Sequence, residues 1–279
     1  MTNTDIKSVE AAVTPNNPIT FLLDWELTMK CNLDCTYCEV GENGGHDNST
    51  QHPKLSDCLR TLDFMFEYAD LYMQNKRSKN KQVILNIYGG ESLHHPDIVD
   101  ILAGIADKKA KYTSWNLTVT CTTNAIVSTK KMLSVIPYIQ HFTVSYHTES
   151  TAKQQQQFKD NVLLLKQHNK AVKCIVLMNP PEQYFANAID MIEWCKLNAI
   201  DHLPRQLDVP MTEAATVNKF KWYSNNQVIW FNKLYSDKSF QAEVKIDTSK
   251  EQVNLTQEGR ACCGGRQLCT NQNYKTRHF

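Results

Sequence analysis

Short β-rich segments alternate with longer segments of helical periodicity between residues 19 and 210. Such alternation is typical of βα units whose strands form one parallel sheet. We expect six strands, at Ile19–Leu27, Val83–Tyr88, Leu117–Thr122, His141–Tyr146, Val172–Met178 and Asp201–Leu207.

The segments between these strands have apolar residues three and four positions apart, which is the spacing of one buried helix face. In the first segment these positions include Leu55, Cys58, Leu62 and Met65. The predicted helices are Leu55–Met73, Pro96–Lys109, Lys130–Ile136, Thr151–His168 and Glu182–Leu197, followed after the last strand by an aromatic helix, Phe220–Tyr235.

The number of units predicts the architecture. Six units in this span average about 32 residues each, a normal length for a βα unit, whereas a closed eight-stranded barrel needs about 250 residues. The sequence therefore predicts an α/β fold over residues 19–210, a partial (β/α)6 TIM-like barrel that stays open. Residues 1–18 are predicted to be a polar N-terminal tail, and residues 211–279 a short C-terminal appendage.

Composition and charge narrow the class of protein. The 279 residues are 42% hydrophobic and 21% charged, which is typical of a folded globular protein. The 30 Lys and Arg residues nearly balance the 29 Asp and Glu residues, so the net charge of +1 favours neither nucleic acid nor an anionic membrane as a partner. Modification of RNA is disfavoured because the only basic cluster is the short tail from Lys275.

The N-terminus lacks the apolar core of a secretory signal, and no apolar run is long enough to span a membrane. We therefore expect a cytoplasmic protein, in which thiols stay reduced. Ten cysteines in such a chain indicate metal binding or catalysis more than disulfides. Four of them lie singly in apolar patterns and are predicted to be buried core thiols: Cys58, Cys121, Cys174 and Cys195.

Three cysteines form a compact group after the first strand. Cys31, Cys35 and Cys38 have the spacing C-x3-C-x2-C, and the loops that follow the strands of α/β barrels build the active site. Three thiolates can hold three irons of a [4Fe–4S] cluster, which normally takes four cysteines. The fourth iron is left open, and an open coordination position is the mark of a catalytic metal site.

A second motif, Gly89-Gly90-Glu91, follows the second strand. Glycines remove Cβ atoms where the backbone must approach a ligand closely, and a glutamate can accept hydrogen bonds from an ammonium group. Because the carboxyl ends of adjacent parallel strands lie side by side, we expect the two motifs to form one site.

Together the motifs resemble the hallmarks of the radical S-adenosylmethionine (radical SAM) superfamily, C-x3-C-x-aromatic-C after strand one and Gly-Gly-Glu after strand two. Cys31, Cys35, Tyr37 and Cys38 match the first hallmark without gaps. The resemblance covers residues 19–207 and implies a partial (β/α)6 barrel whose [4Fe–4S] cluster chelates S-adenosylmethionine through its open iron. It implies reductive cleavage to methionine and a 5′-deoxyadenosyl radical, which abstracts hydrogen from a substrate, with electrons from a donor such as a flavodoxin or ferredoxin.

The resemblance also implies roles for single residues in cofactor binding. Tyr37 looks like the aromatic residue whose backbone meets the adenine, and Glu91 like the partner of the methionine ammonium group. Asn124 resembles the asparagine of the Thr-Asn-Gly end of the third strand, and Ser145 matches the serine that contacts the ribose or carboxylate. The chain departs from the family at Ser92, where proline is usual after Gly-Gly-Glu.

Another departure follows the fourth strand, where many relatives continue Ser-x-Asp-Gly and this chain has His147 and Glu149. Both lie where a substrate is expected, and with Arg205 on the sixth strand they are the candidate catalytic residues. The structural alternatives are bonds within the local loop for the first two and an ion pair for Arg205. The arginine common on the following helix is absent, which leaves two lysines as candidate carboxylate partners, Lys153 and Lys159.

The C-terminal region holds the remaining cysteines, Cys262, Cys263 and Cys269. It resembles the opening of the twitch or SPASM appendages, in which relatives bind auxiliary iron–sulfur clusters. Such appendages continue to further cysteines, whereas this sequence has ten residues after Cys269. A second iron–sulfur cluster, a degenerate tail and a zinc site all remain open, and zinc could also combine Cys35 and Cys38 with two C-terminal cysteines.

The substrate follows less directly. Appendages of this kind are frequent in peptide-modifying members, so the resemblance favours a peptide or protein side chain, with a small molecule or nucleoside as the alternative. A different class of function is a non-catalytic iron–sulfur or metal-binding accessory protein. The intact Cys31, Cys35, Cys38 and Glu91 favour the enzyme.

Overall fold

The computed structural model describes residues 19–38, 51–207, 223–236 and 267–271. Within these ranges strands and helices alternate as the sequence predicts. The strands are β1 (Ile19–Thr28), β2 (Lys81–Gly89), β3 (Asn116–Thr123), β4 (His141–Tyr146), β5 (Ala171–Met178), β6 (Asp201–Gln206) and β7 (Gln267–Asn271). The helices are α2 (Leu55–Gln74), the 3-10 helix η1 (Ser92–His94), α3 (Ile98–Lys109), α4 (Thr129–Val135), α5 (Ala152–Gln167), α6 (Glu182–Leu197) and α7 (Asn225–Ser236).

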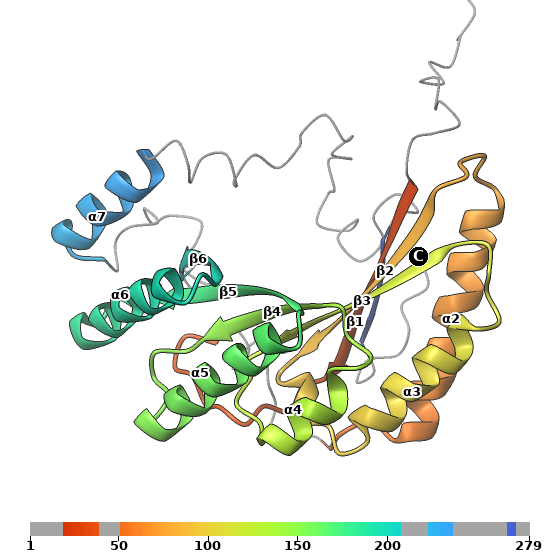
Figure 1. Cartoon of the computed structure of the whole chain (residues 1–279), viewed down its shortest axis with the longest axis horizontal. Helices are drawn as coiled ribbons and strands as arrows, with labels where there is room; N and C mark the ends of the chain where they lie inside the picture. Colours follow the sequence, from red (N-terminus) through yellow and green to blue (C-terminus); the bar gives the residue numbers. More distant parts are fainter. Residues whose placement is uncertain (1–18, 39–50, 208–222, 237–266, 272–279) are drawn as a thin grey trace, which may run out of the picture.

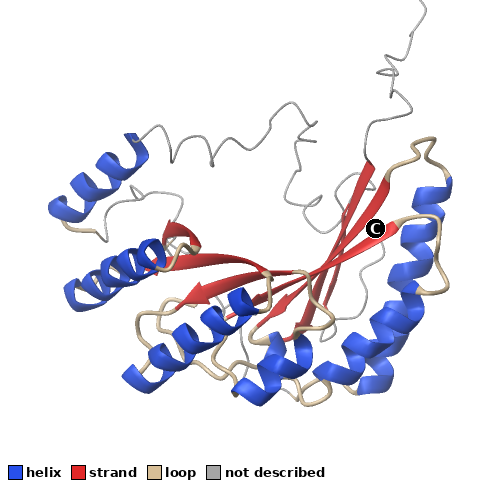
Figure 2. Cartoon of the chain, in the orientation of Figure 1, coloured by secondary structure: helices blue, strands red, loops and turns tan. Residues whose placement is uncertain are grey.

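The strands form one open parallel sheet in the order β6-β5-β4-β3-β2-β1-β7. Helices α2 to α6 lie along one face of the curved sheet (Figures 1 and 2). Because each of the first six strands adds beside its predecessor, right-handed crossovers place all the connecting helices on the same face. The predicted partial (β/α)6 barrel is confirmed.

One strand was not expected. The polar C-terminal segment contains β7, which runs parallel to β1 and pairs Gln267 with Leu22 and Cys269 with Asp24. In a six-stranded barrel β1 would form a free edge. Here β7 pairs with that edge, which leaves fewer backbone donors and acceptors of β1 unpaired.

The two faces of the sheet differ in polarity. On β1 every second residue is buried toward the helices, and the intervening positions belong to the opposite, concave face. On that face Asn86 Nδ2 donates to Asp24 Oδ1 (2.9 Å), and Thr120 Oγ1 donates to Asn86 Oδ1 (3.0 Å), which links β1, β2 and β3. The concave face is therefore polar, unlike the packed apolar interior of a closed barrel. The helix side of β1 consists of Phe21, Leu23, Trp25 and Leu27.

The last described helix begins later than the sequence predicted. Residues Tyr223 and Ser224 precede α7 instead of belonging to a helix that starts at Phe220. Ser224 and Gln227 form a reciprocal cap, because Gln227 N donates to Ser224 Oγ (3.4 Å) and Ser224 N donates to Gln227 Oε1 (2.8 Å). The Tyr223 hydroxyl donates to Met178 O (2.6 Å), which attaches α7 at the end of β5.

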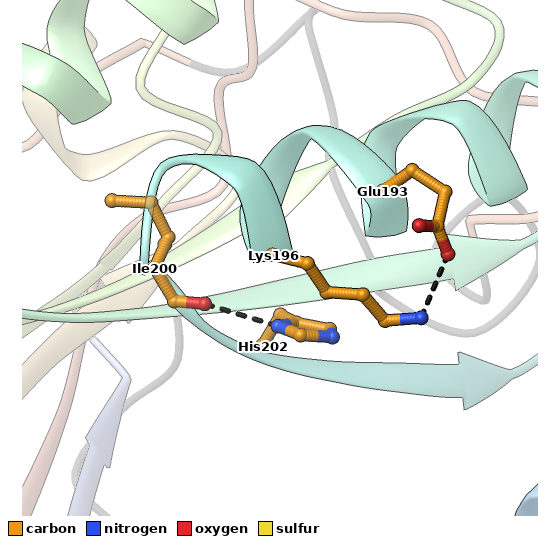
Figure 3. A network of polar contacts seen from close by, with 4 residues as sticks. All are labelled: Glu193, Lys196, Ile200 and His202. Carbon is orange, nitrogen blue, oxygen red and sulfur yellow. Dashed lines mark hydrogen bonds and ion pairs between the residues drawn. The ribbon is translucent and has the colours of Figure 1, made fainter.

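The turn from α6 into β6 leads to the other edge of the sheet (Figure 3). Lys196 Nζ pairs with Glu193 Oε1 at 2.7 Å on the exposed helix surface, and His202 Nδ1 lies 3.0 Å from Ile200 O. Ala199 turns the chain in the left-handed conformation (φ 49°) that ends many helices. Among the described residues no helix is long and apolar enough to cross a membrane.

Candidate functional site

A cavity of about 200 Å³ lies at the carboxyl ends of β1 to β4. The predicted site residues that line it are Cys31, Cys35, Cys38, Gly89, Gly90, Asn124, Ser145 and His147. Residues that are up to 116 positions apart in the sequence thus surround one space. Four further residues that line it were not selected from the sequence, namely Glu26, Leu33, Thr122 and Thr123, although the alternation along β1 and β3 already placed Glu26 and Thr122 on the concave face.

The cysteine loop is held from the β3 side by two asparagines. Asn124 Nδ2 donates to Asn32 Oδ1 (2.7 Å), and Asn32 Nδ2 donates to Ile126 O (2.7 Å). Asn124 is itself buried, and its side chain accepts a hydrogen bond from Ile126 N (2.9 Å). The predicted residue Asn124 therefore positions the loop between Cys31 and Cys35, through a partner that the sequence did not identify.

The same loop is held from the β4 side by a carboxylate. Glu149 accepts hydrogen bonds from Thr36 N (2.8 Å), from the Thr36 hydroxyl and from Asn179 Nδ2 (3.0 Å). Glu149 is not one of the described residues that line the cavity. These bonds are not the expected bond within Glu149's own loop, because Thr36 lies 113 positions away; they hold the ends of β1, β4 and β5 together. The catalytic role of Glu149 stays a prediction.

The two glycines are needed for backbone packing within the chain, and not only for contact with a ligand. A Cβ on Gly90 would lie 2.5 Å from Met29 O and as close to Lys30 O, and one on Gly89 would overlap Thr28 O. Gly89 also has φ 146°, which favours glycine. The short contacts carry hydrogen bonds, from Gly90 N to Thr28 O (2.8 Å) and from Glu91 N to Lys30 O (2.7 Å). Both glycines let the segment before Cys31 pack directly on the end of β2.

Glu91 is buried and is not among the described residues that line the cavity. Its carboxylate accepts from Leu93 N (2.9 Å), Thr123 Oγ1 (2.6 Å) and Asn124 N (2.6 Å), and burial raises its pKa. A carboxylate has about four acceptor positions, so these three bonds leave about one for a further donor. In this arrangement Glu91 joins the ends of β2 and β3; its role toward an ammonium group stays a prediction.

Hydrogen-bond donors lie near the Cys31 sulfur, and burial affects the thiols of Cys31 and Cys35. Leu33 N donates to Cys31 Sγ (3.4 Å), and Asn124 Nδ2 lies 3.8 Å from the same sulfur. Burial raises the pKa of Cys31 to about 11 and that of Cys35 to about 12. The free thiols are therefore protonated at neutral pH, and binding of iron must release their protons.

These residues fit an iron–sulfur cluster. Three thiols from one loop line a single cavity. Two N–H groups lie next to Cys31 Sγ, and hydrogen bonds to the sulfurs are one of the ways in which proteins tune such clusters. In the described part of the chain, no three His, Cys, Asp or Glu side chains converge on a point that could hold one ion. In a [4Fe–4S] cluster each cysteine binds a different iron, so its ligands need not converge on one ion.

The other predicted residues lie in different places. Arg205 is exposed on β6 and does not line the cavity, and neither candidate carboxylate partner on α5 does: Lys153 is exposed, and Lys159 Nζ lies 5.8 Å from the centre of the Trp194 ring. Cys262 and Cys263 lie outside the described residues. The four single cysteines are buried, which confirms their prediction as core thiols.

Two histidines, His52 and His95, pack against each other next to the end of β1. His52 Nδ1 lies 2.9 Å from Thr28 Oγ1, and the buried His95 bonds Pro53 O and Asp97 N through its two ring nitrogens. Burial and the neighbouring His95 lower the pKa of His52 to about 4, and burial lowers that of His95. Both rings are therefore neutral in the folded protein near neutral pH.

Acid should destabilise the protein through these two rings. The unfolded chain takes up protons at histidine near pH 6.5, while the folded chain resists protonation until a lower pH, so the free energy of unfolding falls as pH drops below about 6.5. Urea midpoints at about pH 7.5 and about pH 5, compared between the wild type and His52→Gln, measure this effect. We expect a smaller drop for His52→Gln; equal drops in both proteins would contradict the assignment.

Comparison with known proteins supports the fold. No protein-family model and no curated protein sequence matches the chain. Streptococcus suis SuiB bound to S-adenosylmethionine superposes with a TM-score of 0.53 at 17% identity, over 81% of this chain and 49% of SuiB. The protein anSMEcpe with bound AdoMet superposes with a TM-score of 0.54 at 13% identity, over 79% of this chain and 62% of anSMEcpe.

The chain thus spans about half the length of SuiB and about three fifths of anSMEcpe. Both structures hold S-adenosylmethionine. The fold implied by the resemblance to the radical SAM superfamily is confirmed: the chain has the fold of these two S-adenosylmethionine-binding proteins.

Proposed function

We propose that the chain is a radical SAM enzyme with a [4Fe–4S] cluster on Cys31, Cys35 and Cys38. The observation that carries the proposal is the cavity in which these thiols meet Gly89 and Gly90 at the ends of β1 and β2. When bound, such a cluster supplies the electron that cleaves the C–S bond of S-adenosylmethionine.

The residues around the thiols suit the cofactor. Ser145 and Asn124 line the same cavity as the cysteines, so both can bind polar groups of the cofactor. The half-buried Glu26 also lines it, and burial raises the pKa of this carboxyl. The hydrogen bonds of Asn124 and Glu149 to the cysteine loop keep the three thiols around one cavity.

The substrate we infer is a peptide or protein side chain, with a small molecule or nucleoside as the alternative. The polar concave face of Asp24, Asn86 and Thr120 lies below the cavity and suits a substrate that forms hydrogen bonds. The anSMEcpe structures include one with bound AdoMet and Cp18Cys peptide, which is in accord with a peptide substrate. We further propose that a protein such as a flavodoxin or ferredoxin donates the electron, and that the enzyme works in the cytoplasm.

The test is made without oxygen. We expect the purified and reconstituted protein to contain about four iron and four sulfide per chain and, with dithionite and S-adenosylmethionine, to form 5′-deoxyadenosine, measured by chromatography. A fully loaded protein that forms none would contradict the enzyme and favour a non-catalytic iron–sulfur protein. Incubation with cell extract, followed by mass spectrometry of peptides and metabolites, then distinguishes the substrate classes.

A further inference from the structure

His147 lies between the cysteine loop and the end of β4. Its Nδ1 atom is 3.3 Å from Cys35 Sγ and 3.1 Å from the Tyr37 hydroxyl oxygen. The imidazole and the Tyr37 ring are nearly parallel, with an interplanar angle of 3° and centroids 6.1 Å apart. One imidazole nitrogen therefore faces both a predicted iron ligand and the aromatic residue of the same motif.

The chemistry of the three groups limits how they bond. A thiolate that binds iron has no proton and can only accept hydrogen bonds, whereas imidazole N–H and phenol O–H can donate. Either Nδ1–H donates to the sulfur directly, or the Tyr37 hydroxyl donates to the sulfur and accepts from Nδ1–H. In both arrangements the pair gives Cys35 a side-chain donor.

The surroundings hold the pair in this position. Glu149, two residues after His147, binds Thr36 N at 2.8 Å, and Thr36 lies between Cys35 and Tyr37. Cys38 N donates to Cys35 O (3.1 Å), which closes the loop on itself. Cys31 differs, because one of its donors, Leu33 N, belongs to the backbone. The donors to Cys35 can therefore be removed by substitution without changing the backbone.

We propose that His147 and Tyr37 act on Cys35 as a donor pair that raises the reduction potential of the cluster. Hydrogen bonds to cysteine sulfurs stabilise the more negative, reduced state, and they are one of the factors that tune such potentials. His147 is then a positioning and tuning residue, not a catalytic one. This inference rests on the proposed cluster on Cys31, Cys35 and Cys38.

The experiment compares isosteric side chains. His147→Leu removes the donor, while His147→Asn keeps an N–H donor on a side chain of nearly the same shape; Tyr37→Phe removes only the hydroxyl. The reconstituted full-length proteins are titrated anaerobically at one pH without S-adenosylmethionine, and the reduced fraction is followed by electron paramagnetic resonance with iron counted in each sample.

We expect the equilibrium constant for reduction to fall about tenfold in His147→Leu, which is 59 mV for one electron, and less in His147→Asn. Tyr37→Phe should shift the potential in the same direction. If His147→Leu assembles no cluster, Tyr37→Phe and His147→Asn decide the question. Fully loaded His147→Leu and Tyr37→Phe proteins that both keep the wild-type potential would overturn the inference, whereas His147→Asn, which retains a donor, is expected to stay closer to it. A wild type that holds a reducible cluster but never cleaves S-adenosylmethionine would instead overturn the proposed enzyme and leave the donor pair standing.

Discussion

Replacing Cys35 with alanine is expected to lower the formation of 5′-deoxyadenosine to the level seen without enzyme. Cys35 is one of three thiols that line the cavity, and its loss leaves two protein ligands for a cluster that normally takes three or four. The iron content should fall with the activity. The fold should persist, because Cys35 is only half-buried and removing its side chain opens no large cavity in the core.

Cys58→Ala is the matched control. Cys58 is fully buried in α2, away from the cavity, and is one of the predicted core thiols. Its replacement should cost about 1 kcal/mol of unfolding free energy and leave iron content and 5′-deoxyadenosine formation unchanged. A Cys35→Ala protein that keeps both iron and cleavage would refute the ligand assignment, whatever the result for Cys58→Ala.

Gly90→Ala should be among the most destabilising single substitutions in this chain. The added Cβ would stand 2.5 Å from Met29 O and would also overlap Lys30 O. Both are backbone atoms of the segment before Cys31, which is held on the end of β2 by the hydrogen bonds from Gly90 N to Thr28 O and from Glu91 N to Lys30 O. The strand ends must separate, so we expect a loss of about 3 kcal/mol or more in the free energy of unfolding, together with loss of bound iron.

Gly104→Ala tests the same change where the neighbour can move. Its Cβ would meet only the end of the Leu59 side chain, at 2.5 Å, and alanine is favoured over glycine inside a helix by about 1 kcal/mol. We expect a stability within about 1 kcal/mol of the wild type, measured by urea denaturation. Equal effects of the two substitutions would show that the contact at Gly90 is not what holds the loop.

Sequence patterns predicted most of the fold because they are local. Strand β4 and helix α6 have the predicted bounds, His141–Tyr146 and Glu182–Leu197. Alternating and three-to-four spaced apolar residues report burial within a few positions of themselves. The start of α7 was predicted too early, because the helical pattern of aromatic residues extends N-terminal to the helix. The Ser224–Gln227 cap sets the actual start of α7.

Strand β7 shows the limit of the same reasoning. Its segment is short and polar, so no local pattern separates it from a loop. It forms a strand beside β1 because the edge of that strand offers unpaired backbone groups. Only the order of strands in the folded sheet makes that edge available.

By itself the sequence determined the βα order, the buried thiols and the spacing that brings Cys31, Cys35 and Cys38 onto one loop, because each of these depends on neighbours along the chain. The tertiary structure decided what surrounds the thiols. Thr36 meets Glu149, and Cys35 meets His147, across 113 and 112 residues. Such contacts depend on which strand ends lie side by side, and parallel pairing through right-handed crossovers, not local pattern, sets that arrangement.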